Sequence, residues 1–231
     1  MKGTLLNTAT VAVGSIVGLG LGRILPSTLM PVAMGALGLV TIAMGLKMTL
    51  AARNPVLVAG SLVAGGLIGA LMGIAPRLEG LGGWLKTAVG GSGPFVEGFV
   101  TATVLFCVGP MTILGCIEDG LTGRSETLHL KATLDGVAAL FFATALGVGI
   151  LFSALSVLIV QGAITLLARP LRPLRDRPEA LAELTGVGGM VLLAIGLGLL
   201  DVKHLPVADF LPALVLAPGA ALVLGRAKVG A

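Results

Sequence analysis

Long apolar runs alternate with short polar segments along most of this chain. Seven apolar segments are about as long as a helix that crosses a bilayer, which needs about 20 residues. Charged residues and prolines separate them, as expected where helices end. The segments are approximately Thr4–Gly22, Met30–Leu46, Pro55–Ile74, Pro94–Leu121, Ala132–Ala168, Leu184–Leu200 and Val207–Leu224.

Composition supports the same fold class. Hydrophobic residues make up 56% of the 231 residues and charged residues 11%, whereas a soluble domain carries roughly a quarter charged residues. We therefore predict an all-α, multi-pass membrane protein that forms one transmembrane domain over residues 1–231. The 36 glycines favour close packing of helices.

The fourth apolar segment contains a break. Gly109-Pro110 lies in its middle, and proline lacks the amide hydrogen that a continuous helix needs. Within a bilayer such a break persists only where its freed backbone groups meet protein, water or a ligand. Residues 94–122 thus form either a kinked span or a re-entrant hairpin.

The fifth segment is too long for one crossing. As one straight helix, Ala132–Ala168 would measure about 55 Å. It must protrude from the bilayer, bend near Gly147 and Gly149, or break near Ser153.

A partial internal repeat is visible. Residues 35–46 match residues 186–197 at about half of their positions. The same alignment register places Pro55 opposite Pro206. A weaker match aligns residues 4–8 with residues 132–136. We expect two three-helix repeats, residues 4–75 and 132–225, joined by the interrupted element. They are parallel repeats if that element crosses the membrane and inverted repeats if it does not.

Polar residues in or beside the apolar segments are the candidate site. Asp135 either pairs with Lys131 one helical turn earlier or binds an ion, because ionisable groups in spans are costly unless paired or used. Glu118 and Asp119 form either a solvated turn or a cation-binding pair. Asn7 and Gln161 either join helices by hydrogen bonds or contact a solute. The predicted substrate-binding or ion-binding residues are Asp135, Glu118, Asp119, Asn7, Gln161 and Thr112, with a gate at Gly109 and Pro110.

Several longer motifs resemble one family. They are residues 106–123 (FCVGPMTILGCIEDGLTG), residues 131–136 (KATLDG), residues 161–168 (QGAITLLA) and residues 211–214 (LPAL). Together they are similar to a bacterial integral membrane family of unknown function that includes YqgA and YdfK. The resemblance covers essentially the whole chain and implies a bacterial inner-membrane location, with no activity implied.

Two functions are compatible with these features. The first is a small secondary transporter or channel for an ion or small polar solute. The second is a scaffold or sensor whose basic loop at residues 169–177 binds anionic lipid or a partner protein. We expect no enzyme activity, cofactor, metal centre or nucleic-acid partner, because no matching motif is present. Self-association into a homo-oligomer is compatible with the small-residue faces. Counting basic residues places the loop 169–183 and the C-terminus in the cytoplasm.

Overall fold

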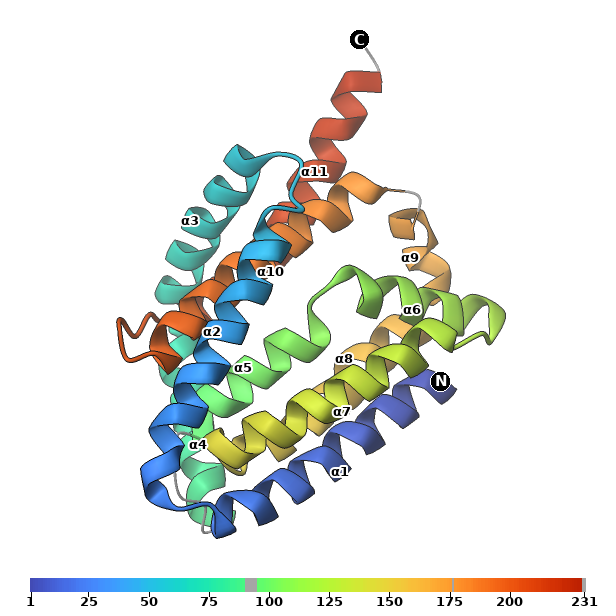
Figure 1. Ribbon diagram of the computed structural model, residues 1–231. Coiled ribbons are helices and arrows are strands. Elements are labelled where there is room, and N and C mark those ends of the chain that lie inside the picture. The colour runs from blue at the N-terminus through green and yellow to red at the C-terminus, as the bar shows by residue number, and fades with distance from the viewer. Residues whose placement is uncertain (90–94, 176, 230–231) are drawn as a thin grey trace. The chain divides into compact units, whose positions relative to one another are not determined.

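The computed structural model describes residues 1–89, 95–175 and 177–229, and over these ranges the regular structure is helical. Figure 1 shows the helices in chain order. Two short 3-10 helices, Ser27–Leu29 and Val207–Phe210 (η2), supplement the α-helices. The α-helices are α1 Lys2–Ile24, α2 Met30–Thr49, α3 Pro55–Met72, α4 Ile74–Val89, α5 Phe95–Cys107, α6 Pro110–Thr122, α7 Glu126–Leu146, α8 Gly149–Leu166, α9 Ala168–Arg175, α10 Pro178–Leu199 and α11 Ala213–Val229.

Seven helical segments in the described ranges are long and apolar enough to cross a membrane. Six are α1, α2, α3, α7, α8 and α10, and the seventh is Val207–Leu224. The pair α5 and α6 passes the same test only when taken together, and it bends by 58° at its break. The prediction of an all-α protein with about seven spans and an interrupted central helix is therefore confirmed.

The segment 132–168 is two helices, so the predicted segments do not correspond one to one with the spans. The break falls at Gly147 and Val148, between α7 and α8. Gly147 has a φ of 77°, a left-handed conformation that glycine adopts without the steric cost of a Cβ. Of the three alternatives, the chain takes the turn near Gly147 and Gly149. Ser153 lies inside α8, and its hydroxyl donates to the carbonyl of Ile150.

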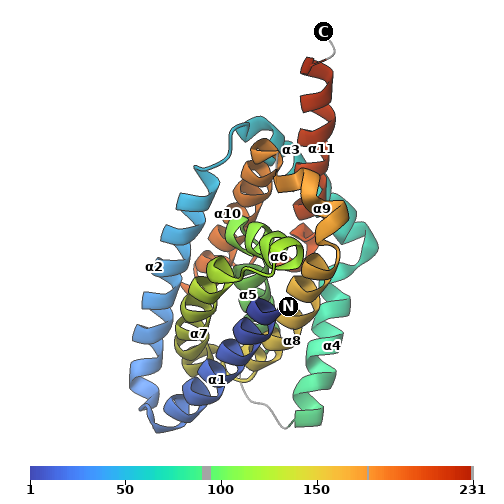
Figure 2. The same ribbon diagram turned by 90° about the vertical axis from the view of Figure 1, so that its right-hand side faces the viewer.

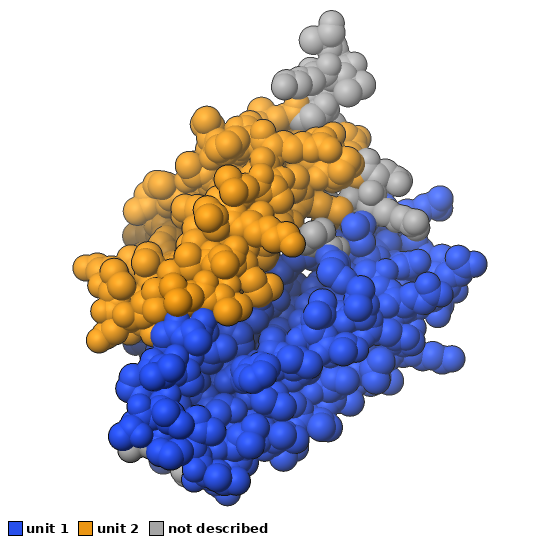
Figure 3. Space-filling view, in the orientation of Figure 1, with its two compact units in different colours: residues 1–37, 79–172 blue, residues 38–78, 173–231 orange. Residues whose placement is uncertain are grey.

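The chain forms two compact units, which Figure 3 colours separately. Unit 1 comprises residues 1–37 and 79–172, and unit 2 comprises residues 38–78 and 173–231. The first predicted repeat is divided between them, because α1 belongs to unit 1 and α3 to unit 2. The predicted repeat boundaries therefore do not coincide with the units.

In unit 1, α1 lies along α7 and runs in the same direction (Figures 1 and 2). Gly3 lies against Leu128, Gly18 against Leu140 and Gly22 against Thr144. A Cβ at Gly14 would overlap the carbonyl oxygen of Gly136. Small residues at this spacing let the two backbones touch, which is how spans associate when lipid offers no hydrophobic drive.

In unit 2, residues 38–49 of α2 run antiparallel to α10. Gly38 lies against Leu200, and Gly45 lies against Gly189. Helix α3 packs on α10 and α11 through a small apolar core formed by Val58, Val187, Ala213 and Ala217.

The two sequence matches therefore relate helix pairs of opposite relative direction. The match of residues 35–46 to 186–197 joins the antiparallel pair α2 and α10. The weaker match of residues 4–8 to 132–136 joins the parallel pair α1 and α7. A single duplication relates all of its helix pairs by one symmetry operation. For spans near the membrane normal, every pair would then be parallel or every pair antiparallel. The internal repeat stays a prediction.

Candidate functional site

Buried carboxylates separate into two kinds in the described part of the chain. Four acidic residues are buried, namely Asp119, Asp135, Glu183 and Asp209. Three of them accept backbone N–H groups in the first turn or at the N-cap of a helix, where the helix dipole favours negative charge. The fourth, Asp135, lies within a span and accepts only from side chains.

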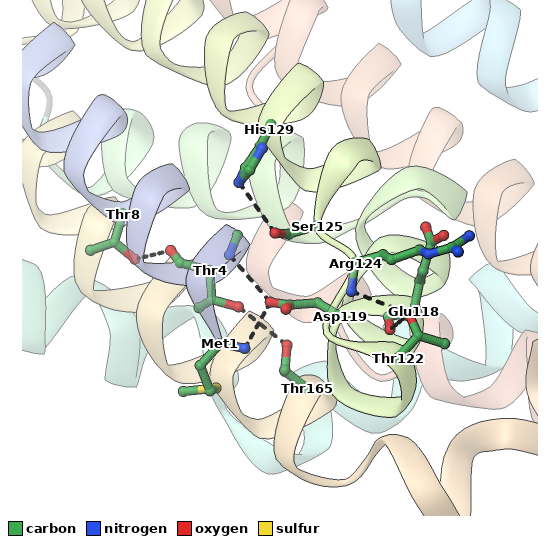
Figure 4. Close-up of polar contacts among 11 residues, drawn as sticks. Met1, Thr4, Thr8, Glu118, Asp119, Thr122, Arg124, Ser125, His129 and Thr165 are labelled. Atoms are coloured by element: carbon green, nitrogen blue, oxygen red, sulfur yellow. Dashed lines mark hydrogen bonds and ion pairs between the residues drawn. The ribbon is translucent and has the colours of Figure 1, made fainter.

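Asp119 binds the start of α1. Its Oδ2 accepts from the amide of Gly3 at 3.2 Å and lies 2.8 Å from the amino nitrogen of Met1. Figure 4 shows the Asp119 carboxylate between these groups, with the hydroxyls of Thr4 and Thr165 3.2 Å apart beside it. This carboxylate satisfies backbone donors that a helix start leaves unpaired. These contacts assign Asp119 a helix-capping role.

Glu118 points to a different partner. Its Oε2 accepts from the hydroxyl of Thr127 at 3.1 Å, and the side chain is half-buried. Although Glu118 and Asp119 are adjacent in sequence, each has its own partner, and no bond between their carboxylates is present among the contacts of the described residues. These contacts give no support to the prediction that they form one cation-binding pair.

In unit 2, Glu183 and Asp209 accept backbone N–H groups at or just before the starts of two other helices. Oε1 of Glu183 accepts from the amides of Arg53 and Asn54, at 3.1 and 2.9 Å, just before α3. Oδ1 of Asp209 accepts from the amide of Ala75 at 2.9 Å, at the start of α4. Neither residue was predicted from the sequence, because their partners lie about 130 residues away and no local motif signals them.

Replacing Glu183 with alanine should destabilise the protein by about 1–3 kcal/mol, the cost of leaving the part-buried amides of Arg53 and Asn54 without their acceptor. The matched control is Glu179→Ala, one turn earlier on α10, since Glu179 is half exposed and pairs only with exposed Arg53. That control should change stability by about 0–1 kcal/mol. Unfolding in mixed detergent micelles measures both, and equal losses would contradict the capping role.

Asp135 forms a buried ion pair with Lys131. The Lys131 ammonium donates to both carboxylate oxygens, at 2.8 and 2.7 Å, and both side chains are less than a tenth exposed. Asn7 on α1 also donates to this carboxylate through Nδ2, at 2.9 Å. An ion pair inside a span costs desolvation energy that its own attraction only partly returns.

Two buried amide oxygens near this pair have no donor. They are Oδ1 of Asn7 and Oε1 of Gln161, and both side chains are fully buried. The orientation of each amide is fixed by its partner. The NH2 of Asn7 faces a carboxylate, and that of Gln161 faces the carbonyl of Phe106 at 3.4 Å; both partners are acceptors. The two amide oxygens must therefore point elsewhere, which leaves a surplus of acceptors.

The break between α5 and α6 lies beside the same groups. In a continuous helix the amide of residue 110 would donate to the carbonyl of Phe106, but residue 110 is proline. That carbonyl instead accepts from the hydroxyl of Thr112 at 3.1 Å and from Gln161. Gly109 has a φ of 153°, a region essentially restricted to glycine.

These groups form one polar core inside unit 1. We define it as Asn7, the Phe106 carbonyl, Thr112, Lys131, Asp135 and Gln161. Helices α5 and α6, which flank the break, both pack on α7 and α8, the helices that carry the ion pair and Gln161. Four predicted binding residues, Asn7, Thr112, Asp135 and Gln161, meet here beside the predicted gate at Gly109.

Lys131 is part of the polar core, although the sequence indicated it only as a structural partner of Asp135. The i,i+4 spacing was the signal that could have identified it. In the described part of the chain, no three His, Cys, Asp or Glu side chains gather in a way that could hold a metal ion. The polar core therefore offers oxygen ligands with a single carboxylate.

Comparison with known proteins gives a consistent result. A family model described as "Protein of unknown function (DUF554)" matches residues 2–222. The chain is 30% identical over 222 residues to the "Uncharacterized membrane protein YdfK" of Bacillus subtilis (strain 168), and the match covers 94% of each chain. It is 30% identical over 228 residues to the "Uncharacterized protein YqgA" of Escherichia coli (strain K12), which covers 93% of this chain and 94% of that one. No solved structure matches the chain.

Proposed function

The chain is a multi-pass membrane protein that belongs to the DUF554 family, and we propose that it is a small secondary transporter or channel for an ion or a small polar solute. The solute binds in the polar core of unit 1. Asp135, Asn7 and Gln161 supply the contacts, and the break at Gly109-Pro110 acts as the gate.

One observation carries this proposal: a buried ion pair and two unpaired amide oxygens lie beside a broken helix. A charge buried in a span is retained against its desolvation cost when it serves a ligand or a pathway. Buried acceptors without donors are rare in folded proteins, and a bound ion or water is one of the explanations for them. A bound solute would supply that partner.

The helix break supports a moving part. Transporters commonly place their binding sites at discontinuous helices, where backbone groups are free to meet a substrate. Among the residues that the structure describes, the Phe106 carbonyl accepts from the side chains of Thr112 and Gln161 alone. Exchanging such side-chain bonds requires less rearrangement than breaking a continuous helix, so α6 can change its angle to α5 at this point.

Flux into proteoliposomes tests the proposal. Labelled sodium, potassium, chloride, phosphate and small amino acids are each offered to vesicles that contain the purified protein. We expect at least one solute to enter faster than into empty vesicles and Asp135→Asn to lower that rate at least tenfold. The control Glu126→Gln alters an exposed acid at the start of the same helix and should leave the rate unchanged.

Two results would refute transport through this site. One is the absence of protein-dependent flux for every solute in the panel. The other is a flux that Asp135→Asn leaves intact in a folded protein, as judged by gel filtration in detergent.

Either result would favour the alternative function, a scaffold or sensor that uses the basic segment 169–177. The observation behind that alternative is that Arg169 and Arg172 on α9 are both exposed and free to meet lipid phosphate.

We also place the protein in the bacterial cytoplasmic membrane, with the loop 169–183 and the C-terminus on the cytoplasmic side. This placement rests on the excess of basic residues in that loop, since positively charged loops remain inside. Labelling single cysteines, introduced at position 172 and at exposed Lys203, with an impermeant maleimide would test it. In intact cells, the residue at position 172 should be protected from the reagent.

A further inference from the structure

We propose that the polar core binds a small zwitterionic amino acid, such as glycine or alanine. Its ammonium lies on the two unpaired amide oxygens, and its carboxylate lies at Lys131 and the start of α6. This inference rests on the proposed transport function and specifies the class of solute. The geometry of unit 1 carries it, because buried acceptors, unused donors and an open space occur at one level of the helices.

Asn7 and Lys131 lie at the same level of unit 1. Gly3 on α1 lies against Leu128 on the parallel helix α7. Asn7 is four residues after Gly3 and Lys131 is three residues after Leu128, so the two side chains start level with each other. Both donate to one carboxylate, that of Asp135.

Gln161 reaches this level from α8. Helices α1 and α8 pack against each other, and they run in opposite directions because α7 is parallel to α1 and turns back into α8 (Figure 1). The hydroxyls of Thr4 on α1 and Thr165 on α8 are 3.2 Å apart. Asn7 lies one turn after Thr4 and Gln161 one turn before Thr165, so both amides belong to the next layer of this contact.

The start of α6 supplies unused backbone donors beside this layer. Helix α6 begins at Pro110, and the amides of Met111 and Thr112 fall in its first turn, where no intrahelical acceptor is available. Thr112 and Gln161 both donate to the Phe106 carbonyl, at 3.1 and 3.4 Å, which places this first turn beside the Gln161 amide. Such amides and the helix dipole favour an anionic group, as at the broken helices of transporters.

Lys131 also has a donor to spare. An ammonium carries three N–H groups, and that of Lys131 uses at most two of them on the oxygens of Asp135. No other bond from this ammonium is present among the residues that the structure describes. The core thus combines unused donors with two unpaired acceptors, Oδ1 of Asn7 and Oε1 of Gln161. A solute that matches both must carry an acceptor group and a donor group.

An open space borders the break. Gly109 is buried, yet a Cβ built on it would meet no atom of the described residues within 4 Å. At Gly149, where α8 meets α5, a Cβ would instead overlap the carbonyl oxygen of Phe95. The helices are therefore in close contact nearby but leave room at the break. Since the amides of Asn7 and Gln161 are fully buried, this room suits a small solute.

Charge balance favours a solute without net charge. The Lys131 ammonium and the Asp135 carboxylate cancel, so the empty core is neutral. A lone cation or anion would leave a net charge in a low-dielectric site, which is strongly unfavourable. A zwitterion adds no net charge, and it brings an ammonium for the acceptors and a carboxylate for the donors. A small amino acid has this combination of groups.

Competition in detergent tests the solute class. Radiolabelled glycine is equilibrated with the purified protein, and the unlabelled competitors are glycine, alanine, methylamine, acetate and urea. Methylamine has only the cationic group, acetate has only the carboxylate, and urea has donors without charge. A site built to hydrogen-bond its solute rejects analogues that leave its polar groups unpaired. We expect glycine and alanine to displace the label at concentrations at least tenfold lower than the other three.

Gln161→Met tests the acceptor side of the core. Methionine retains the length of the side chain but removes the amide oxygen, so the affinity for glycine should fall at least tenfold. Thr133→Val is the matched control, because Thr133 is an exposed residue of α7 whose hydroxyl donates to a carbonyl of its own helix. That control should leave the affinity unchanged. Glycine binding that survives Gln161→Met in folded protein would overturn the inference.

Asp135→Asn separates solute binding from a structural role. The variant leaves Lys131 as the only charge of the core, so a lone anion then restores neutrality. Labelled acetate should bind the variant at least tenfold more tightly than it binds the wild type, whereas labelled glycine should bind less tightly. Lys131→Met makes the opposite change of charge and should favour methylamine in the same way. A folded variant that loses affinity for every one of these solutes would contradict the assignment.

The outcomes distinguish the two proposals. If sodium, potassium, chloride or phosphate shows flux that depends on Asp135, while glycine and alanine show neither flux nor binding, transport stands and the amino-acid assignment falls. If glycine binds with the expected selectivity but does not enter vesicles, the assignment of the bound solute stands and transport through the core falls. Methylamine, acetate or urea that competes as well as glycine would also overturn the assignment.

Discussion

Replacing Lys131 alone with methionine is expected to lower the free energy of unfolding by about 3–5 kcal/mol, the cost of leaving a buried charge without its partner. Methionine retains most of the length of the side chain, so the effect is electrostatic more than steric. The Asp135 carboxylate would keep only its bond from Asn7. Unfolding in mixed detergent micelles, followed by circular dichroism, measures the loss.

The double variant Lys131→Met, Asp135→Asn should regain more than half of that loss, since it leaves no buried charge at all. Neutral replacements for a buried ion pair are often as stable as the pair itself. Recovery would mean that the pair contributes little net stability, which agrees with a functional reason for retaining it. If the double variant were less stable than either single variant, the pair would be a net stabilising feature and that argument would fail.

The bilayer explains why so much of the fold was predictable. Each span must be long and apolar, so the limits of most helices follow from the charges and prolines that end them. The break before Pro110 was predictable for the same local reason, because the missing amide cannot be replaced within the helix. The turn at Gly147 was one of three alternatives that the sequence left open. No charge or proline marks it, and only the excessive length of residues 132–168 indicated that a turn was needed.

Most residues of the polar core could be predicted from the sequence, but the hydrogen bonds between them could not. Asp135, Asn7, Gln161 and Thr112 stood out as polar residues in apolar surroundings. The bond from Asn7 to Asp135 joins residues on separate helices, and no sequence spacing indicates such a contact. The roles of Asp119, Glu183 and Asp209 were missed because a helix start can be capped by a residue from anywhere in the chain.

Gly14→Val is expected to have the second large effect on stability. A Cβ at this position would overlap the Gly136 carbonyl oxygen, and the backbone of a packed helix cannot move aside as a flexible side chain can. Overpacking typically costs about 1–3 kcal/mol and occasionally more, and we expect the upper end or beyond. Gly20→Val on the same helix is the matched control, because a Cβ there would meet nothing within 4 Å.

Gly14→Val should also disturb the polar core, because it moves α1 away from α7. Asn7 lies two turns before Gly14 on α1, so forcing α1 away from α7 draws the Asn7 amide away from Asp135. Gly14→Val should therefore reduce flux at least tenfold in the fraction of the protein that remains folded, while Gly20→Val should not reduce it. Normal flux in folded Gly14→Val would show that Asn7 is dispensable and would restrict the site to Lys131, Asp135 and the broken helix. Loss of flux in both variants would instead point to a general intolerance of α1 to larger side chains.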